Sequence, residues 1–153
     1  MESWKNLGDS TLRVFAEYAD LTSYWWTGDP RTRNISYGHH IYNDGYRYRG
    51  RPVGHWADQD SQIISIGGIL QRMDGIGWGG TLRTGKLNED GSGRNSVSDN
   101  TSTDYFSFDV FNARQYPQYD LSVHTSLGWE SLQPQGKAKD DLLTGSIVLT
   151  RQF

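Results

Sequence analysis

The chain has 153 residues, a net charge of -3 and no cysteine. That length suits one ordinary domain, the charge argues against a nucleic-acid-binding protein, and the lack of cysteine excludes disulfides, thiolate nucleophiles and cysteine-ligated zinc. With 18 glycines, 13% aromatic residues and a mean hydropathy of -0.72, the composition favours short strands and turns, and no apolar run is long enough for a transmembrane helix.

The first ten residues, MESWKNLGDS, contain neither a basic region nor an apolar core. We therefore expect no secretory signal in them. This leaves two expectations: the protein stays in the cytoplasm, or the chain is a piece of something longer.

Six segments alternate between apolar and polar residues, as β-strands do when one face is buried or lipid-facing. No segment keeps apolar residues at helical spacing for three turns. The predicted strands are Thr11 to Thr22, Gln62 to Arg72, Ile76 to Leu87, Asp104 to Arg114, Tyr119 to Ser131 and Leu142 to Phe153.

The fifth predicted strand has the clearest pattern. Its apolar face begins at Tyr119 and ends at Trp129, and the opposite face carries His124 and Glu130. In a strand tilted by about 40°, these two aromatic residues span about 25 Å along the barrel axis, which matches the lipid-facing band of an outer-membrane barrel. The fourth strand is ambiguous, because both of its faces carry aromatic residues.

The connections between these strands alternate between long and short. The segments 23–61 and 88–103 are long, and the loop near 132–141 is of medium length, whereas 73–75 and 116–118 are tight turns. Outer-membrane barrels show this pattern, with long extracellular loops and short periplasmic turns.

A soluble β-sandwich or small barrel explains the alternation but not the loop pattern. Six strands are too few for a closed transmembrane barrel, and an open edge cannot face lipid. We therefore expect an all-β antiparallel meander, with residues 1–153 forming a single segment, the C-terminal part, of a larger outer-membrane barrel.

Three motifs, in this order and followed by a C-terminal β-strand, resemble a known family: RVFAEYAD, IYNDGYRYRGRPVGH and GKLNEDG. They are similar to the capsule assembly proteins called Wzi, outer-membrane barrels of Gram-negative bacteria that act as surface lectins. The resemblance implies three partners: capsular polysaccharide, outer-membrane lipid and the remaining N-terminal strands of the parent barrel. It also implies an outer-membrane location with extracellular loops.

The long segment 23–61 is rich in residues that suit sugar binding. Tyrosine and tryptophan offer flat platforms for sugar rings, and arginine binds the carboxylates of an acidic polymer. The predicted polysaccharide-binding residues are Trp25, Trp26, Tyr37, His40, Tyr42, Asp44, Tyr46, Arg47, Tyr48 and Arg49. An equally weighted alternative is a packed polar network that only holds the loop in place.

Other chemistry has little support in the sequence. His39, His40 and His55 match no standard zinc spacing, and no paired carboxylates or nucleophile motif stand out. We expect no metal, no cofactor and no catalytic residues. Besides capsule binding, two hypotheses stay open: a porin-like channel lined by Arg83, His124 and Glu130, and a soluble β-domain of unknown ligand.

Overall fold

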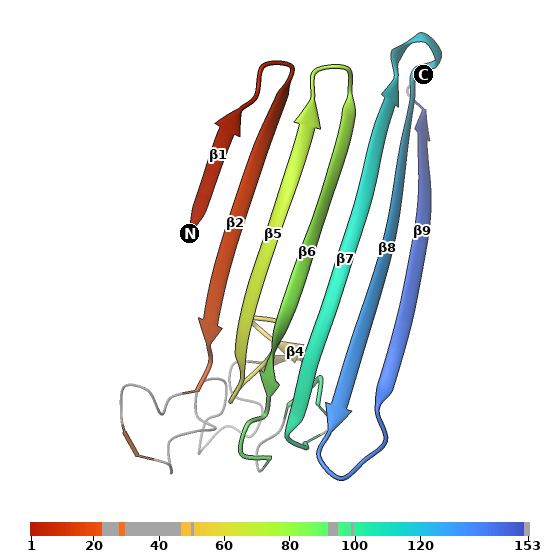
Figure 1. Ribbon diagram of the computed structural model, residues 1–153. Helices are drawn as coiled ribbons and strands as arrows, with labels where there is room; N and C mark the ends of the chain where they lie inside the picture. Colours follow the sequence, from red (N-terminus) through yellow and green to blue (C-terminus); the bar gives the residue numbers. More distant parts are fainter. Residues whose placement is uncertain (23–27, 30–46, 50, 92–94, 99, 152–153) are drawn as a thin grey trace.

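The computed structural model describes residues 1–22, 28–29, 47–49, 51–91, 95–98 and 100–151. One seven-stranded sheet dominates this part of the chain (Figure 1). Its strands are β1 (Glu2–Asn6), β2 (Ser10–Asp20), β5 (Gln62–Arg72), β6 (Ile76–Leu87), β7 (Thr103–Tyr116), β8 (Leu121–Pro134) and β9 (Asp140–Arg151). The short strands β3 (Arg47–Tyr48) and β4 (Arg51–Pro52) form a separate hairpin.

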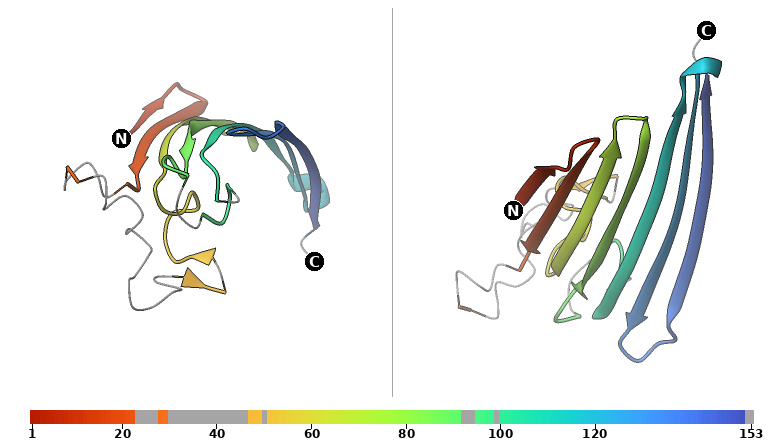
Figure 2. Two further views of the ribbon diagram at one scale, coloured as in Figure 1. Left: turned by 90° about the horizontal axis from the view of Figure 1, so that it is seen from below. Right: turned by 45° about the horizontal axis from the view of Figure 1, so that its top comes forward.

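The large sheet is an antiparallel meander in which neighbours in the chain are neighbours in the sheet. It curves strongly, and the β3–β4 hairpin and residues 53–61 lie on its concave side (Figure 2). Figure 1 shows the tight turns at one end of the sheet and the longer connections at the other. The predicted alternation of connection lengths is confirmed.

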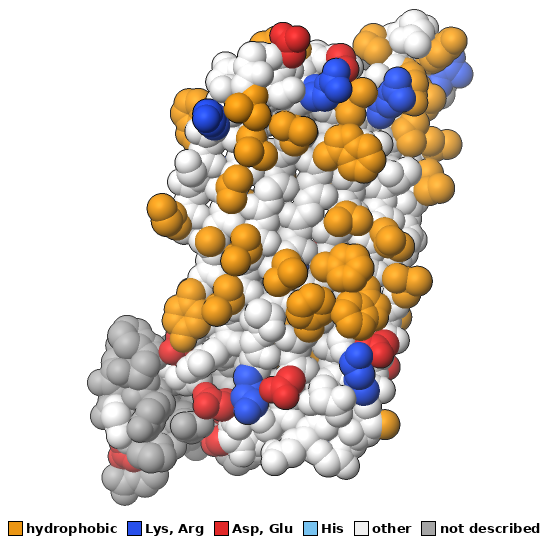
Figure 3. Space-filling model, in the orientation of Figure 1, with side chains coloured by type: hydrophobic (Ala, Val, Ile, Leu, Met, Phe, Trp, Pro, Cys, Tyr) orange, Lys and Arg blue, Asp and Glu red, His pale blue; other side chains and the backbone are white. Residues whose placement is uncertain are grey.

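The convex face is apolar and exposed. The strand register places Ile66, Leu82, Phe108, Trp129 and Leu143 in one row across five strands. Figure 3 shows hydrophobic side chains spread over this face, with charged residues gathered toward its two ends. Ile147 and Leu149 are 74% and 66% exposed, and a large continuous apolar face to which such side chains contribute is rare on a soluble monomer.

Aromatic residues lie toward both ends of the convex face. Trp78 stands near the tight turns, on the third residue of β6, and is exposed. Near the other end, the Trp129 ring lies 5.6 Å from Phe106 and 5.9 Å from Phe108, measured between ring centroids. Two aromatic levels flanking an apolar band are typical of transmembrane barrels.

The concave face is polar and contains glycines covered by aromatic rings. A Cβ on Gly67 would lie 2.3 Å from the ring of Phe15, and one on Gly79 would lie 2.4 Å from the ring of Phe111. Each ring therefore occupies the space above a glycine directly opposite it in the register. Glycines covered in this way allow a sheet to bend while its backbone stays protected.

A small core lies at the loop end of the concave face. Its buried apolar members are Ala57, Ile63, Leu87 and Tyr105. Asn95 lies beside this core, and its side-chain amide donates hydrogen bonds to the carbonyls of Ala57 (2.9 Å) and Gln59 (3.1 Å). Its side-chain oxygen accepts from the backbone amides of Val97 and Ser98. One side chain thus fastens the segment after β4 to the loop after β6.

The structure confirms the all-β meander and corrects several boundaries. The predicted strands 62–72 and 76–87 are observed with those bounds, while β1 was not predicted. The prediction that Tyr119 begins the fifth strand is wrong, because Pro117–Tyr119 forms a 3-10 helix and Asp120 then takes a left-handed conformation with φ of 49°. The ambiguity of β7 is resolved by register: Phe106, Phe108 and Val110 face the convex side.

Candidate functional site

The β3–β4 hairpin carries the described part of the predicted sugar-binding segment. Tyr48 pairs with Arg51, and Arg49 turns the chain with φ of 51°. Tyr48 as a whole residue is 67% exposed. The guanidinium carbon of Arg49 lies 5.4 Å from the centre of the Tyr48 ring, within cation–π distance. The hairpin therefore presents a flat aromatic surface and a positive charge together.

Most of the predicted sugar-binding residues cannot be placed against this hairpin. Arg47 contributes the backbone of β3, and its ladder partner is Pro52. The others lie outside the described residues: Trp25, Trp26, Tyr37, His40, Tyr42, Asp44 and Tyr46. Their role stays a prediction, as does the alternative of a packed polar network.

The segment after the hairpin returns to the concave face and is held there by hydrogen bonds within the segment and to the loop after β6. Asp58 accepts the backbone amides of Gln59 (2.8 Å) and Ser96 (2.9 Å), and both Asp58 and Asp60 have positive φ. Asp60 accepts the backbone amide of Asp90 at 2.8 Å. These bonds fix the position of Trp56, which immediately precedes the buried part of the segment.

His55 stands at the start of this returning segment. Its Nδ1 accepts the backbone amide of Ala57 at 3.3 Å, and its ring lies 5.6 Å from Trp56. Burial lowers the pKa of His55 below its ordinary value of 6.5, and the charge of Glu17 partly opposes that shift. The neutral ring is therefore favoured in the fold, as its role as an acceptor requires.

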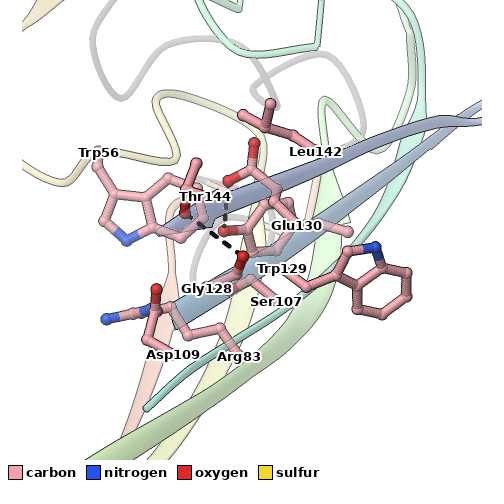
Figure 4. Close-up of a pocket in the computed structure, with 10 residues that line it drawn as sticks. Trp56, Arg83, Ser107, Asp109, Gly128, Trp129, Glu130, Leu142 and Thr144 are labelled. Carbon is pink, nitrogen blue, oxygen red and sulfur yellow. Dashed lines mark hydrogen bonds and ion pairs between the residues drawn. The ribbon is translucent and has the colours of Figure 1, made fainter. Parts of the chain in front are cut away.

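A pocket of about 390 Å³ opens on the concave face next to Trp56; we call it the Trp56 pocket. Figure 4 shows Trp56 on one side and Arg83 and Asp109 on another, with the Trp129 ring turned away from the rest. Its lining residues come from the returning segment and from strands β6 to β9: Trp56, Arg83, Tyr105, Ser107, Asp109, Gly128, Trp129, Glu130, Leu142 and Thr144.

Two polar pairs organise the Trp56 pocket. Arg83 Nη1 and Asp109 Oδ2 form an ion pair between β6 and β7. Tyr105 donates its hydroxyl proton to Glu130 Oε2 at 3.1 Å. Trp56 lies against Tyr105, with ring centroids 4.9 Å apart, so the loop and the sheet wall meet at the pocket.

The sequence carries one signal for the strand residues of this pocket, which is the alternation of the strands. Tyr105, Ser107 and Asp109 occur at every second position of β7, and Gly128 and Glu130 do the same on β8. These residues share the polar face on which the sequence pattern also predicts Arg83. Alternation could not predict Trp56 as a pocket residue, because the segment between β4 and β5 is not a strand and has no period of two.

Neither a metal-binding cluster nor a transmembrane helix is found in the part of the chain that the structure describes. No group of three His, Asp or Glu side chains is arranged to hold a metal ion there. Over the same residues, no helix has the length and apolar character needed to cross a membrane.

Comparison with known proteins gives a consistent picture. One solved structure is similar over 99% of this chain, with a TM-score of 0.75 and 23% identity. It is Wzi of Escherichia coli, described as an outer-membrane protein involved in group 1 capsule assembly and a carbohydrate-binding β-barrel. The present chain covers 32% of that protein, so its sheet has the fold of part of such a barrel wall.

Among curated proteins, no sequence matches this chain. The family model described as capsule assembly protein Wzi matches residues 3–141, which is most of the chain. On this match, and with the fold in agreement, the chain belongs to the Wzi family of capsule assembly proteins.

Proposed function

We propose that this chain forms part of an outer-membrane β-barrel that binds capsular polysaccharide at the surface of a Gram-negative bacterium and helps to attach or assemble the capsule. The observation that carries the binding role is the exposed Tyr48–Arg49 stack at the tip of the β3–β4 hairpin. Family membership supports the link to the capsule.

The convex face supports a place in the membrane. An outward apolar band between two aromatic levels suits lipid, since side chains such as Ile64 and Ile147 would otherwise be exposed to water. Among the described strands, β1 and β9 lie at the two edges of the sheet. Unpaired edges cannot face hydrocarbon, so we propose that further strands of a parent barrel, N-terminal to this segment, complete the wall.

The hairpin suits an acidic polymer. Tyr48 offers a surface for the C–H face of a sugar, while Arg49 and Arg51 are exposed cations that can pair with carboxylates. It lies on the side of the longer connections, which we propose to be extracellular. Binding of this kind needs no bond to be broken, so we propose a lectin and not an enzyme.

The test is capsule retention on living cells. Joint substitution of Tyr46, Arg47 and Tyr48 by alanine is expected to release capsule into the medium while the barrel stays folded in the outer membrane. Tyr119→Ala is the matched control, because Tyr119 is similarly exposed but lies at the end with the tight turns. Capsule that stays attached to the triple variant would show that the hairpin is not the site.

A porin-like channel is the second candidate. Arg83, His124 and Glu130 all face the concave side, which supports a polar barrel interior. The returning segment and Trp56 occupy part of that side, which favours binding over conduction. Planar-bilayer recordings decide between them: a folded barrel that passes no current excludes the channel.

A further inference from the structure

We infer that the Trp56 pocket is a second binding site and that it takes a single uncharged sugar ring. It shares no residue with the β3–β4 hairpin and lies on the concave face of the wall. Because the ligand is a sugar, this inference rests on the proposed function. The inference goes beyond the proposed function by assigning a separate site, and a neutral sugar as the ligand of that site.

The aromatic platform of the pocket is held in place before any ligand arrives. Tyr105 is buried at 5% exposure and supports Trp56 from one side. Trp56 itself stays 38% exposed beside the pocket. A rigid, partly exposed indole loses little conformational entropy when a ligand rests on it, and its flat surface suits the C–H face of a sugar ring.

The polar groups of the pocket are oriented hydrogen-bond acceptors. Arg83 holds Oδ2 of Asp109, and Tyr105 holds Oε2 of Glu130. An ionised carboxylate has about four acceptor positions, so one contact orients the group and leaves capacity for further donors. Sugar hydroxyls are such donors, and two carboxylates on neighbouring strands can engage different hydroxyls of one ring.

The charge of the pocket selects against acidic sugars. Two carboxylates and one guanidinium line it, which leaves one net negative charge. A uronate would bring a second negative charge next to Asp109 and Glu130, and like charges at close range repel. The hairpin is expected to favour acidic sugars instead, because Arg49 and Arg51 are cations.

Gly128 keeps the wall of the pocket open. A Cβ at this position would lie 2.7 Å from Asp109 Oδ1 and 2.9 Å from Thr144 Oγ1, so any side chain would displace both groups. Without one, both oxygens remain beside the pocket, and Thr144 also donates to the Gly128 carbonyl at 3.4 Å. The resulting volume of about 390 Å³ falls within the usual range for small-molecule sites, roughly 300–1,000 Å³.

The inference is tested by titrating the full protein, folded in detergent, with D-glucose, D-galactose, D-mannose and D-glucuronate, and measuring binding by calorimetry or saturation-transfer NMR. At least one neutral hexose is expected to bind saturably, and the binding that depends on Trp56 is expected to be tighter for this hexose than for glucuronate. Trp56→Ala should weaken hexose binding about tenfold, as expected for loss of a central aromatic anchor. Glu130→Gln keeps an acceptor for Tyr105 but removes one negative charge. It should therefore reduce the difference in affinity between hexose and glucuronate.

Tyr48→Ala separates this inference from the proposed function, since it alters the hairpin and should leave hexose binding unchanged. Saturable hexose binding that depends on Trp56 supports the second site even if capsule stays attached to hairpin variants. The inference is overturned if no hexose binds, if glucuronate binds more tightly than every hexose and Trp56→Ala weakens that glucuronate binding, or if neither Trp56→Ala nor Glu130→Gln alters hexose binding in protein that is folded.

Discussion

The two faces of the sheet differ in a way that reverses the rule for soluble proteins. On the convex face, aliphatic side chains such as Ile66 and Leu149 are largely exposed. On the concave face, Ser65, Thr103 and Ser107 are buried, and Arg83 is paired with Asp109. The same seven strands form both faces, so the contrast arises from alternate residues of one backbone.

This contrast supports the proposed placement of the convex face in lipid and of the concave face in a polar interior. Exposed apolar area of this extent is unfavourable in water and favourable in lipid, whereas ion pairs and hydroxyl contacts require a polar interior. Strand register preserves the contrast, because a slip of one residue would exchange the two faces along a whole strand. The two faces therefore provide matched positions for experiments.

The largest expected effect comes from a charge placed on the convex face. Leu127→Arg should destabilise the folded barrel by about 2–4 kcal/mol, the cost of arginine near the middle of a bilayer. Ser126 is the adjacent residue and faces the other side, where its hydroxyl lies 2.8 Å from that of Ser146. Ser126→Arg should cost only about 1 kcal/mol, roughly one hydrogen bond.

Urea unfolding in lipid vesicles, followed by the gel mobility of the folded form, measures both costs. Equal costs at Leu127 and Ser126 would contradict the proposal that the convex face meets lipid.

A smaller effect is expected in the loop core on the concave side. Asn95→Ala removes the amide that bonds to the carbonyls of Ala57 and Gln59, leaving buried polar groups without that partner. We expect a loss of about 1–3 kcal/mol, confined to the loops. Hydrogen exchange should show faster exchange in residues 57–61 while strands β7 and β8 stay protected.

The neighbouring residue Ser96 supplies the control. Its backbone amide bonds to Asp58, while its exposed side chain makes no comparable contact among the described residues. Ser96→Ala should leave exchange unchanged. Similar acceleration in both variants would show that Asn95 does not fasten the two loops.

The smallest expected effect is a pH dependence of the same segment. The folded pKa of His55 lies below 6.5, so the unfolded segment binds a proton more readily than the folded one. The stability of the segment is therefore complete above pH 6.5 and falls as the pH drops toward the lowered value. Exchange of the Ala57 amide, corrected for its intrinsic pH dependence, should accelerate over that interval.

His55→Gln should abolish this acceleration, whereas His124→Gln, on β8, should preserve it. A profile that His55→Gln does not alter would assign the pH dependence to another group.

Much of the wall could be predicted from the sequence because a strand imposes a period of two. The bounds 62–72 and 76–87 followed from alternation and from the glycine turn between them. Alternation failed where a local conformation interrupts it, as at Pro117–Tyr119, and where a strand is short, as in β1. The aromatic residues of both faces of β7 needed the register of β6 and β8 before they could be assigned.

The residue pattern alone established the strand period, the order of long and short connections and the family motifs, since all three depend on neighbours in the chain. The Trp56 pocket depended on the fold, because its parts come from a loop and four strands that meet only when the sheet curves. Asn95 likewise gains its role from carbonyls 38 and 36 positions away. Contacts of that range are set by how the chain packs and leave no local pattern in the sequence.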